Sequence, residues 1–418
     1  MFSFSVSRFL DYTELELWTI MNIGIYQSYW GRVGGGQRYV GVVAELLARL
    51  HRVEIVHHCP NFDPATVAEP MELDLSRVAF RYVPCQERPA WPSSNPLRRL
   101  KFEREWGREI STGYDLFIDS SDKVPFFCHA PRGALLIHFP LVTFEEFHGH
   151  NSETWRQRSW PKRLAGQLFH RLEWQRRFAT YQLCVVNAHF TQQWIKRLWG
   201  LNSVVVFPPL RNSLTPRPKQ PLVLTIGAFS HAQHKKHEIT LRAFRKLCDD
   251  GLAGWRYVLA GACSSDDEDR AYVARLRKEA EGYPIEVRTN VSGSELKQLL
   301  EESSLLWHSM GYGVDERTEP RRMEHFGMVA TEAMAAGCVP IVFNGGGLPE
   351  IVTHGQTGYL WRTLNELGAY TLRATRDQGL RERLSEAAKE RARYFGEDRF
   401  TARLFDAFAP VLNGRRPA

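Results

Sequence analysis

Two glutamates lie close together in the segment 324–350, which reads EHFGMVATEAMAAGCVPIVFNGGGLPE. Glu324 and Glu332 are eight positions apart, and Gly327 falls where a loop would turn into a helix. With this spacing Glu324 would lie in the loop beside Gly327, and Glu332 about two turns along the helix, facing the same crevice. Carboxylates in such a place accept hydrogen bonds from hydroxyl groups.

The same segment predicts a site for phosphate. Gly337 would end the helix, and the apolar run 339–343 would follow as a buried strand that leads into the turn 344–347. Ligands bind at strand-to-helix junctions of an α/β sheet because helix N-termini offer unpaired N–H groups and a positive dipole end to phosphate. Phosphate and hydroxyl sites side by side indicate a sugar nucleotide. The alternative is an ordinary helix with solvated glutamates.

Three consecutive glycines, Gly34 to Gly36, stand between the first predicted strand and helix, within GRVGGGQR at 31–38. Gly35 and Gly36 would let a ligand approach the backbone closely. The spacing is not G-x-G-x-x-G, and the second strand ends at Cys59 rather than at an acid, so a nicotinamide site is not indicated. A purely structural tight turn is the alternative.

A basic loop follows the first strand of the second half. The predicted strand 222–226 ends beside Gly227, and Lys235 and Lys236 precede a helix. Their ammonium groups would lie over a pyrophosphate, where a charge-assisted hydrogen bond contributes about 1.5–3 kcal/mol. Two lysines in a solvated loop are the alternative.

The remaining polar clusters do not predict a metal site. DDED, at 266–269, stands where a helix would begin, and acids there favour the helix dipole, so we interpret it as capping. The seven cysteines form no C-x-x-C pair, which argues against a disulfide framework or a thiolate zinc site. His138 ends the apolar run 133–138, where a lone histidine is more often structural.

Basic and aromatic residues alternate in the segment 155–177, which holds seven lysines and arginines against one acid, Glu173. On a helical stretch this pattern suits an anionic lipid surface. The alternative is a long helix that buries its tryptophans inside a domain.

Composition bounds these hypotheses. With 418 residues, 43% hydrophobic and 24% charged, the chain is long enough for two globular domains. The net charge of +7 favours anionic partners. Without zinc-finger spacing or an RNP-type strand, nucleic acid is not expected, which leaves phosphate-bearing ligands and anionic lipid.

No run of eighteen apolar residues is present to span a bilayer. Charged residues in 1–20 make a poor signal peptide, so we expect a disordered extension or a misassigned start.

Strands and helices alternate through both halves of the chain, which indicates two Rossmann-like domains facing each other across a cleft. We expect an N-terminal domain at 21–210, a second domain at 218–395, and a C-terminal helix at 396–418 packing back on the first. The proline-rich stretch 208–221 is the expected linker. The predicted strands are 22–27, 53–59, 116–119, 133–138, 183–186, 203–207, 222–226, 255–259, 285–287, 304–308 and 339–343. The predicted helices include 37–50, 238–249, 269–281 and 294–302.

The segment 324–350 resembles the signature of glycosyltransferase family 4, retaining enzymes with the two-domain GT-B fold. The match comprises Glu324, His325, Phe326, Gly327, Glu332, Ala333, Met334, Ala335, Gly337, Gly346, Gly347 and Glu350. The resemblance implies that Glu324 contacts the donor sugar and Glu332 the nucleotide ribose. It also implies that backbone groups around Phe326, Gly327, Met328 and Val329 hold the sugar or its phosphates.

Further motifs of the family extend the resemblance. It implies that the turn with Gly35 and Gly36 faces the diphosphate and the acceptor, and that His138 lies against the donor sugar. Lys235, after Gly227, matches the family's diphosphate-binding lysine. Ala228 stands where the family often has arginine, and Lys236 or Arg38 would compensate.

We therefore expect a retaining, metal-independent glycosyltransferase without a cofactor. It would move a hexose from GDP-mannose or a UDP-hexose to a glycan or lipid-linked acceptor in envelope polysaccharide or lipopolysaccharide biosynthesis. The departing diphosphate would help to deprotonate the acceptor in a front-face displacement. We expect a cytoplasmic protein that can associate peripherally with the membrane. The alternatives are a degenerate GT-B protein acting as a binding or scaffold subunit, and a sugar-nucleotide epimerase.

Overall fold

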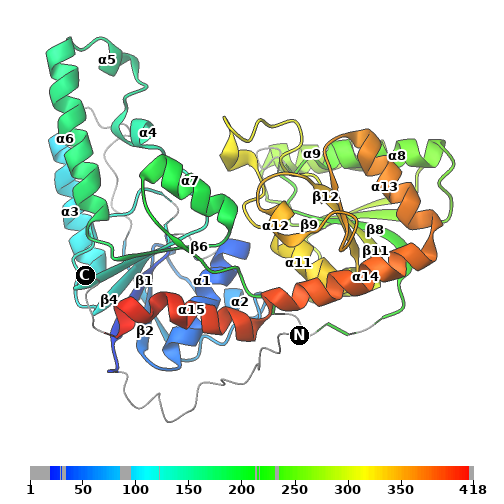
Figure 1. Ribbon diagram of the computed structural model, residues 1–418, viewed down its shortest axis with the longest axis horizontal. Helices are drawn as coiled ribbons and strands as arrows, with labels where there is room; N and C mark the ends of the chain where they lie inside the picture. The colour runs from blue at the N-terminus through cyan, green and yellow to red at the C-terminus, as the bar shows by residue number, and fades with distance from the viewer. Residues whose placement is uncertain are drawn as a thin grey trace, which may run out of the picture. The chain divides into compact units, whose positions relative to one another are not determined.

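The computed structural model describes residues 19–28, 30, 34–84, 96–121, 123–211, 214–215, 217–230 and 235–413 (Figure 1). The expectations for residues 1–18, and for residues 31–33 of the glycine-rich segment, lie outside these ranges.

The first sheet has seven strands in the order β3-β2-β1-β4-β5-β6-β7. The pairs β1–β2, β2–β3, β1–β4 and β4–β5 are parallel. Its strands are β1 Asn22–Tyr26, β2 Arg52–His57, β3 Val78–Tyr82, β4 Leu116–Asp119, β5 Arg132–Ile137, β6 Leu183–Val186 and β7 Val204–Val205. Helices follow the strands as α1 Gly35–Ala48, α2 Ala65–Ala68, α3 Pro96–Ser111, α4 Phe144–His148, α5 Glu153–Arg156, α6 Trp160–Phe178 and α7 His189–Trp199.

The second sheet has six strands, all pairs parallel, in the order β10-β9-β8-β11-β12-β13. Its strands are β8 Gln220–Ile226, β9 Arg256–Gly261, β10 Ile285–Thr289, β11 Ser303–His308, β12 Val339–Phe343 and β13 Tyr359–Trp361. Its helices are α8 His237–Asp249, α9 Asp267–Ala280, α10 Gly293–Glu302, α11 Met328–Ala335, α12 Leu348–Ile351, α13 Leu364–Arg376 and α14 Gln378–Ala392, with 3₁₀ turns η3 Pro320–Arg322 and η4 Arg393–Phe395. The last helix of the chain is α15 Glu397–Leu412.

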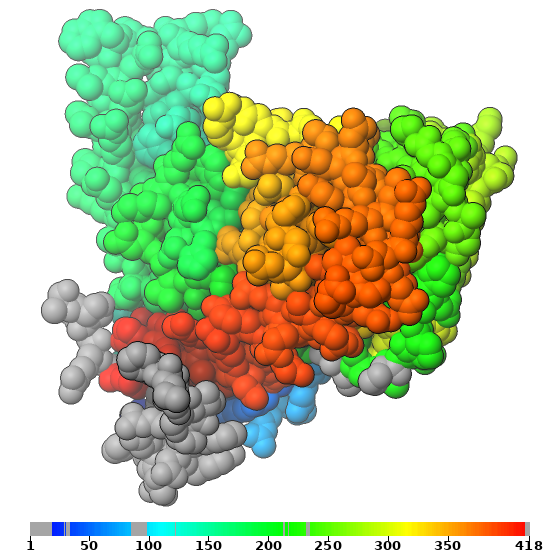
Figure 2. All heavy atoms as spheres, turned by 45° about the vertical axis from the view of Figure 1, so that its right-hand side comes forward, coloured from blue at the N-terminus to red at the C-terminus, as the bar shows by residue number. Residues whose placement is uncertain are grey.

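The strands are apolar because helices cover both faces of the second sheet. All six residues of β11 are buried. On one side α8 packs against α9 and α13, and on the other α11 packs against α10 and α14. Figure 2 shows α13 and α14, in orange and orange-red, on the surface of this unit. Trp307 and Trp361 lie in its core, with Tyr257 and Phe244.

The chain forms two compact units. The first comprises residues 1–185, 201–204 and 403–418, and the second comprises 186–200 and 205–402. Helix α7 is therefore grouped with the second unit, although it precedes the proline-rich stretch where the sequence suggested the boundary. The end of α15 belongs to the first unit, where Arg132 Nη1 donates to the carbonyl oxygen of Val411 at 3.0 Å.

The predicted fold class is confirmed, and the predicted strands 116–119 and 183–186 coincide with β4 and β6. The elements that were missed are the strands β3 and β13 and the helices α2, α3, α4, α7 and α12. The segment 155–177 is not one helix, because α5 ends before α6 begins.

Part of the proposed lipid-facing set in 155–177 lies in the core. Trp155 and Trp174 are buried. Arg177 is fully buried and donates to Glu173 and Glu103, so it cannot meet a lipid surface. These three side chains follow the alternative interpretation, in which the helix packs inside its domain.

Candidate functional site

Strand order defines where a ligand would bind in the second unit. Strands β8 and β11 are neighbours, and the chain leaves them toward opposite edges of the sheet. A doubly wound sheet opens a crevice at such a switch point, outside the carboxyl ends of its strands. The loop after β8 carries Gly227 and Lys235, and the segment after β11 carries Glu324.

Three side chains meet there. Lys235 Nζ lies 2.8 Å from Glu324 Oε2, and His308 Nε2 lies 3.0 Å from the same oxygen. His308 is the last residue of β11 and is buried, whereas the side chains of Lys235 and Glu324 keep 23% and 19% of their surface exposed. In this cluster His308 is therefore enclosed by the protein, whereas the charged groups of Lys235 and Glu324 remain accessible to solvent.

The charges of this cluster are fixed by its contacts. Burial alone would raise the pKa of Glu324, but Lys235 and His308 outweigh it and hold this pKa well below the usual range. Burial lowers the pKa of His308, and Glu324 opposes that shift only in part. The imidazole is thus neutral near pH 7. Since a carboxylate only accepts hydrogen bonds, Nε2 must carry the proton.

Glycines bring the loop of Glu324 against the turn after β12. Gly347 N donates to the carbonyl oxygen of Glu324 at 2.8 Å. A Cβ at Gly346, where φ is +61°, would collide with that carbonyl oxygen, and one at Gly347 with the carbonyl oxygen of His325. The glycines of the predicted turn are thus needed for close backbone approach, which sets the position of Glu324.

Gly327 opens helix α11 as predicted. Its φ is +113°, a conformation that favours glycine, and a Cβ there would come within 2.7 Å of Leu348 Cδ2. Met328 and Val329 form the first turn of α11, where backbone N–H groups have no acceptor within the helix. Phe326 is buried and stacks on Phe207 with ring centroids 5.8 Å apart, so its side chain supports the loop.

Glu332 is half-buried on α11, the helix that begins at this loop. Its assignment to the nucleotide ribose stays a prediction.

The loop after β8 is tied to the neighbouring strands. A Cβ at Gly261 would collide with the carbonyl oxygen of Gly227, and Ser309 Oγ donates to the carbonyl oxygen of Lys235 at 2.8 Å. Lys236 precedes α8 with φ of +59°. His237 is buried against Phe229, and burial lowers its pKa to about 4. Residues 231–234 lie outside the described part.

The predicted residues of the first unit also lie close together. His138 follows β5, and its Nε2 lies 3.1 Å from the carbonyl oxygen of Gly36, in the first turn of α1. Tyr39 packs edge-on against the His138 ring, with centroids 5.5 Å apart. Gly35 begins α1. The structure thus places His138 beside the glycine turn. This agrees with a parallel sheet, in which the end of one strand and the start of the helix after another strand lie at the same edge.

Glu350, the last residue of the signature, caps a helix. Its carboxylate accepts from the backbone N–H groups of His189 and Phe190 at 2.8 and 2.6 Å, at the start of α7. Ala188, the N-cap of that helix, has no side-chain oxygen to do this. Glu350 therefore replaces a missing cap.

His308 and Ser309 were not predicted from the sequence. Both come to the site through the pairing of β11 with β8, which a sequence pattern does not reveal.

Of the acids at 266–269, three lie in the first turn of α9, as expected from the helix dipole, but Asp266 makes no side-chain cap. Within the described ranges, no group of three or more His, Cys, Asp or Glu could hold a metal ion.

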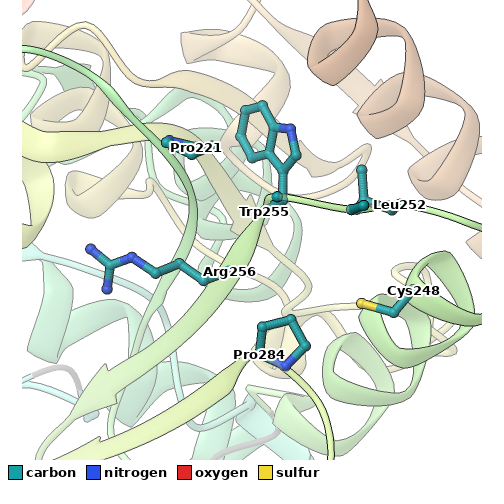
Figure 3. A pocket seen from close by; sticks show the side chains of 8 residues that line it. Pro221, Cys248, Leu252, Trp255, Arg256 and Pro284 are labelled. Atoms are coloured by element: carbon teal, nitrogen blue, oxygen red, sulfur yellow. The ribbon is translucent and has the colours of Figure 1, made fainter.

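One cavity of about 350 Å³ lies at the opposite, amino end of the same sheet (Figure 3). It is lined by Pro221, Trp255 and Arg256 at the starts of β8 and β9, and by Pro284 before β10. No predicted site residue lines it.

Two parallel doubly wound sheets of this kind define the GT-B class, and solved structures with this fold resemble the chain along nearly all its length. The sucrose-phosphate synthase of Thermosynechococcus elongatus is 17% identical with a TM-score of 0.63, covering 93% of this chain and 99% of its own. Anabaena Alr3699/HepE, solved in complex with UDP-glucose, is 14% identical with a TM-score of 0.63 over the same shares of the two chains.

Family models then identify the chain. Residues 33–210 match the model Glycosyltransferase Family 4, and residues 206–391 match Glycosyl transferases group 1. The protein belongs to glycosyltransferase family 4.

Several curated relatives share the description "GDP-Man:Man(3)GlcNAc(2)-PP-Dol alpha-1,2-mannosyltransferase". The protein of Dictyostelium discoideum is 27% identical over 56% of this chain and 48% of its own. That of Mus musculus is 33% identical over 43% and 38%. The matches span about half the length of these relatives or less. None of the described helices is long and apolar enough to cross a membrane.

Proposed function

We propose that this protein transfers a hexose from a nucleoside-diphosphate sugar to a hydroxyl of a glycan or lipid-linked acceptor, with retention and without a metal ion. The observation that carries the proposal is the cluster of Lys235, His308 and Glu324 at the switch point of the second sheet.

The diphosphate of the donor suits the cationic parts of the site. Lys235 supplies a partly exposed ammonium group, and the first turn of α11 supplies backbone N–H groups with the positive end of the helix dipole. As the bond between the sugar and the diphosphate breaks, negative charge grows on the leaving phosphate. Fixed cationic groups stabilise that charge.

Donor binding would change the partners of Lys235. In the structure its ammonium group is paired with Glu324. A diphosphate competes for that group, while His308 still donates to Glu324 and keeps the carboxylate in place. Glu324 can then accept hydrogen bonds from sugar hydroxyls. The pair is therefore a resting arrangement that the donor reorganises.

For the chemical step we keep the front-face displacement. The bond from the anomeric carbon to the diphosphate breaks, the bond to the acceptor oxygen forms on the same face, and the acceptor proton passes to an oxygen of the leaving diphosphate. The site's contribution is electrostatic and positional. Glu332 is assigned to the nucleotide ribose, and the roles of His138, Gly35 and Gly36 stay as predicted from the sequence.

GDP-mannose is the first donor to test, because the curated relatives are described as GDP-mannose-dependent mannosyltransferases acting on a dolichol-linked glycan. A UDP-hexose is the second, since a structural neighbour was solved with UDP-glucose. The corresponding acceptor is a lipid-linked oligosaccharide that ends in a free sugar hydroxyl.

The test is nucleotide release from a panel of GDP-, UDP- and ADP-sugars, with and without lipid-linked acceptor. We expect acceptor-dependent release from one donor, unchanged by EDTA, and a product whose anomeric configuration by NMR is that of the donor sugar. Epimerised donor, or no release from any donor, would favour the epimerase or the scaffold alternative. An inverted product would refute the retaining mechanism.

A further inference from the structure

Helix α6 has one face inside its domain and one face in solvent. The buried face carries His170, Glu173, Trp174, Arg177 and Phe178. The outer face carries four large apolar side chains, Trp160, Leu164, Leu168 and Leu172, which are 75%, 50%, 56% and 51% exposed. Residues four apart lie on one side of a helix, so these four form a single row, called here the α6 ridge.

The α6 ridge differs from ordinary surface residues because several exposed apolar side chains lie together on one helix. Among the described residues, nine large hydrophobic side chains are exposed, and four of them are on this one helix. Scattered apolar side chains need no explanation, but a continuous apolar row bordered by charges marks an interaction surface.

Cationic side chains border the ridge. Lys162, Arg163, Arg171 and Arg176 are exposed on the same helix. The one acid between residues 154 and 179 is Glu173, which is buried and paired with Arg99 and Arg177. The outer face of α6 is therefore both apolar and positive.

The inner face holds the helix rigidly without using the ridge. Figure 1 shows α6 alongside α3, and two buried ion pairs join them, Arg99–Glu173 at 2.9 Å and Arg177–Glu103 at 3.0 Å. Trp174 packs edge-on against Phe144. The ridge can thus be substituted without removing a buried contact.

We propose that the α6 ridge docks the protein on an anionic lipid surface, with the apolar row inserted between headgroups and the arginines and Lys162 on lipid phosphates. A second copy of the chain is the other occupant to consider. If two ridges paired, the cations of one copy would lie near the cations of the other. Neither α6 helix has an exposed acid to offset this repulsion, so the pairing is unfavourable. The inference rests on the surface of the first unit and not on the proposed activity, although a lipid-linked acceptor would be met there.

The experiment is flotation of the full chain with phosphatidylcholine vesicles, with and without phosphatidylglycerol. The ridge variant is Leu164→Gln with Leu168→Gln. The charge variant is Arg163→Gln with Arg171→Gln and Arg176→Gln. The matched control is Leu141→Gln with Leu364→Gln, two exposed leucines elsewhere. Melting temperatures check that each variant is folded.

We expect the wild type and the control to float only with vesicles that contain phosphatidylglycerol. The ridge variant should bind at least about tenfold more weakly, since partial burial of two leucines is lost. The charge variant should lose on the order of a hundredfold, because each cation near an anionic surface contributes a factor of about five. Equal flotation of wild type and ridge variant would overturn the proposal. So would a wild-type dimer in sedimentation that the ridge variant converts to monomer without any vesicle binding.

Discussion

The two sheets order their first six strands alike, but the two units contain ion pairs that differ in burial and in their place on the fold. In the first unit, Arg99, Glu103, Glu173 and Arg177 join α3 to α6, and none of these side chains is more than 6% exposed. In the second unit, Lys235 and Glu324 lie at the carboxyl edge of the sheet and remain about one-fifth exposed.

The difference separates architecture from function. A buried charge network whose carboxylates and guanidinium groups are paired with each other is enclosed in the packing, and a ligand could bind there only by displacing one of these partners. The Lys235–Glu324 pair lies at the switch point of the sheet and is partly exposed to solvent. Its ammonium group can therefore exchange the carboxylate for a phosphate when a ligand binds. Charged clusters in the same fold are therefore distinguished by exposure and by position on the sheet.

The largest expected effect tests the buried charge network between α3 and α6. Arg177→Met leaves Glu103 with no cation and Glu173 with Arg99 only, so the free energy of unfolding should fall by about 3–5 kcal/mol. Urea denaturation measures it. Arg176→Met, an exposed neighbour, is the control and should be close to neutral. A similar stability for both variants would mean that the network does not hold α6.

The second-largest effect is expected for the two charged residues of the Lys235–Glu324 pair. Lys235→Met and Glu324→Gln should each reduce kcat/KM about 100- to 1,000-fold, because each removes a group aimed at the reacting donor. Both should melt like the wild type, since the site is at the edge of the core. Exposed residues of the same types provide controls in Lys246→Met and Glu386→Gln. Near-normal turnover in both site variants would refute the assignment.

A smaller effect is expected at His308, which we assign as a positioning residue. His308→Leu removes the N–H group that helps to lower the pKa of Glu324. That pKa should rise, so the acid limb of the pH–rate profile should move to higher pH, and kcat should fall about ten- to a hundredfold.

His308→Gln keeps a donor N–H group and should restore much of the rate and the position of the acid limb. A merely structural histidine would lower stability in both variants and leave the pH profile unmoved. That outcome would remove His308 from the functional cluster.

The smallest effect concerns the cap of α7. Glu350→Gln weakens the acceptance of two backbone N–H groups and should cost about 0.5–2 kcal/mol in thermal unfolding, with little change in donor binding. If donor affinity fell while stability held, Glu350 would belong to the ligand site instead.

The sequence predicted the parts of the site that local chemistry determines. Gly327, Gly346 and Gly347 stand where the backbone needs a left-handed turn or close approach, and Glu324 lies beside Gly327 and Gly346. Lys235, from the loop after β8, pairs with Glu324. His308 could not be predicted, because its place beside Lys235 depends on the pairing of β11 with β8, far apart in the chain. Helix α3 was missed since its buried side includes Arg99 and Glu103, whose partners lie on α6.

Calorimetric titration of GDP and GDP-mannose, or of the nucleotide pair selected by the donor panel, tests the central assignment most directly. Lys235→Met should weaken binding of the nucleotide and of the nucleotide sugar by a similar factor. Glu324→Gln should weaken the nucleotide sugar alone, because this carboxylate is assigned to sugar hydroxyls. Equal losses for both ligands in Glu324→Gln, or no loss in Lys235→Met, would contradict the account.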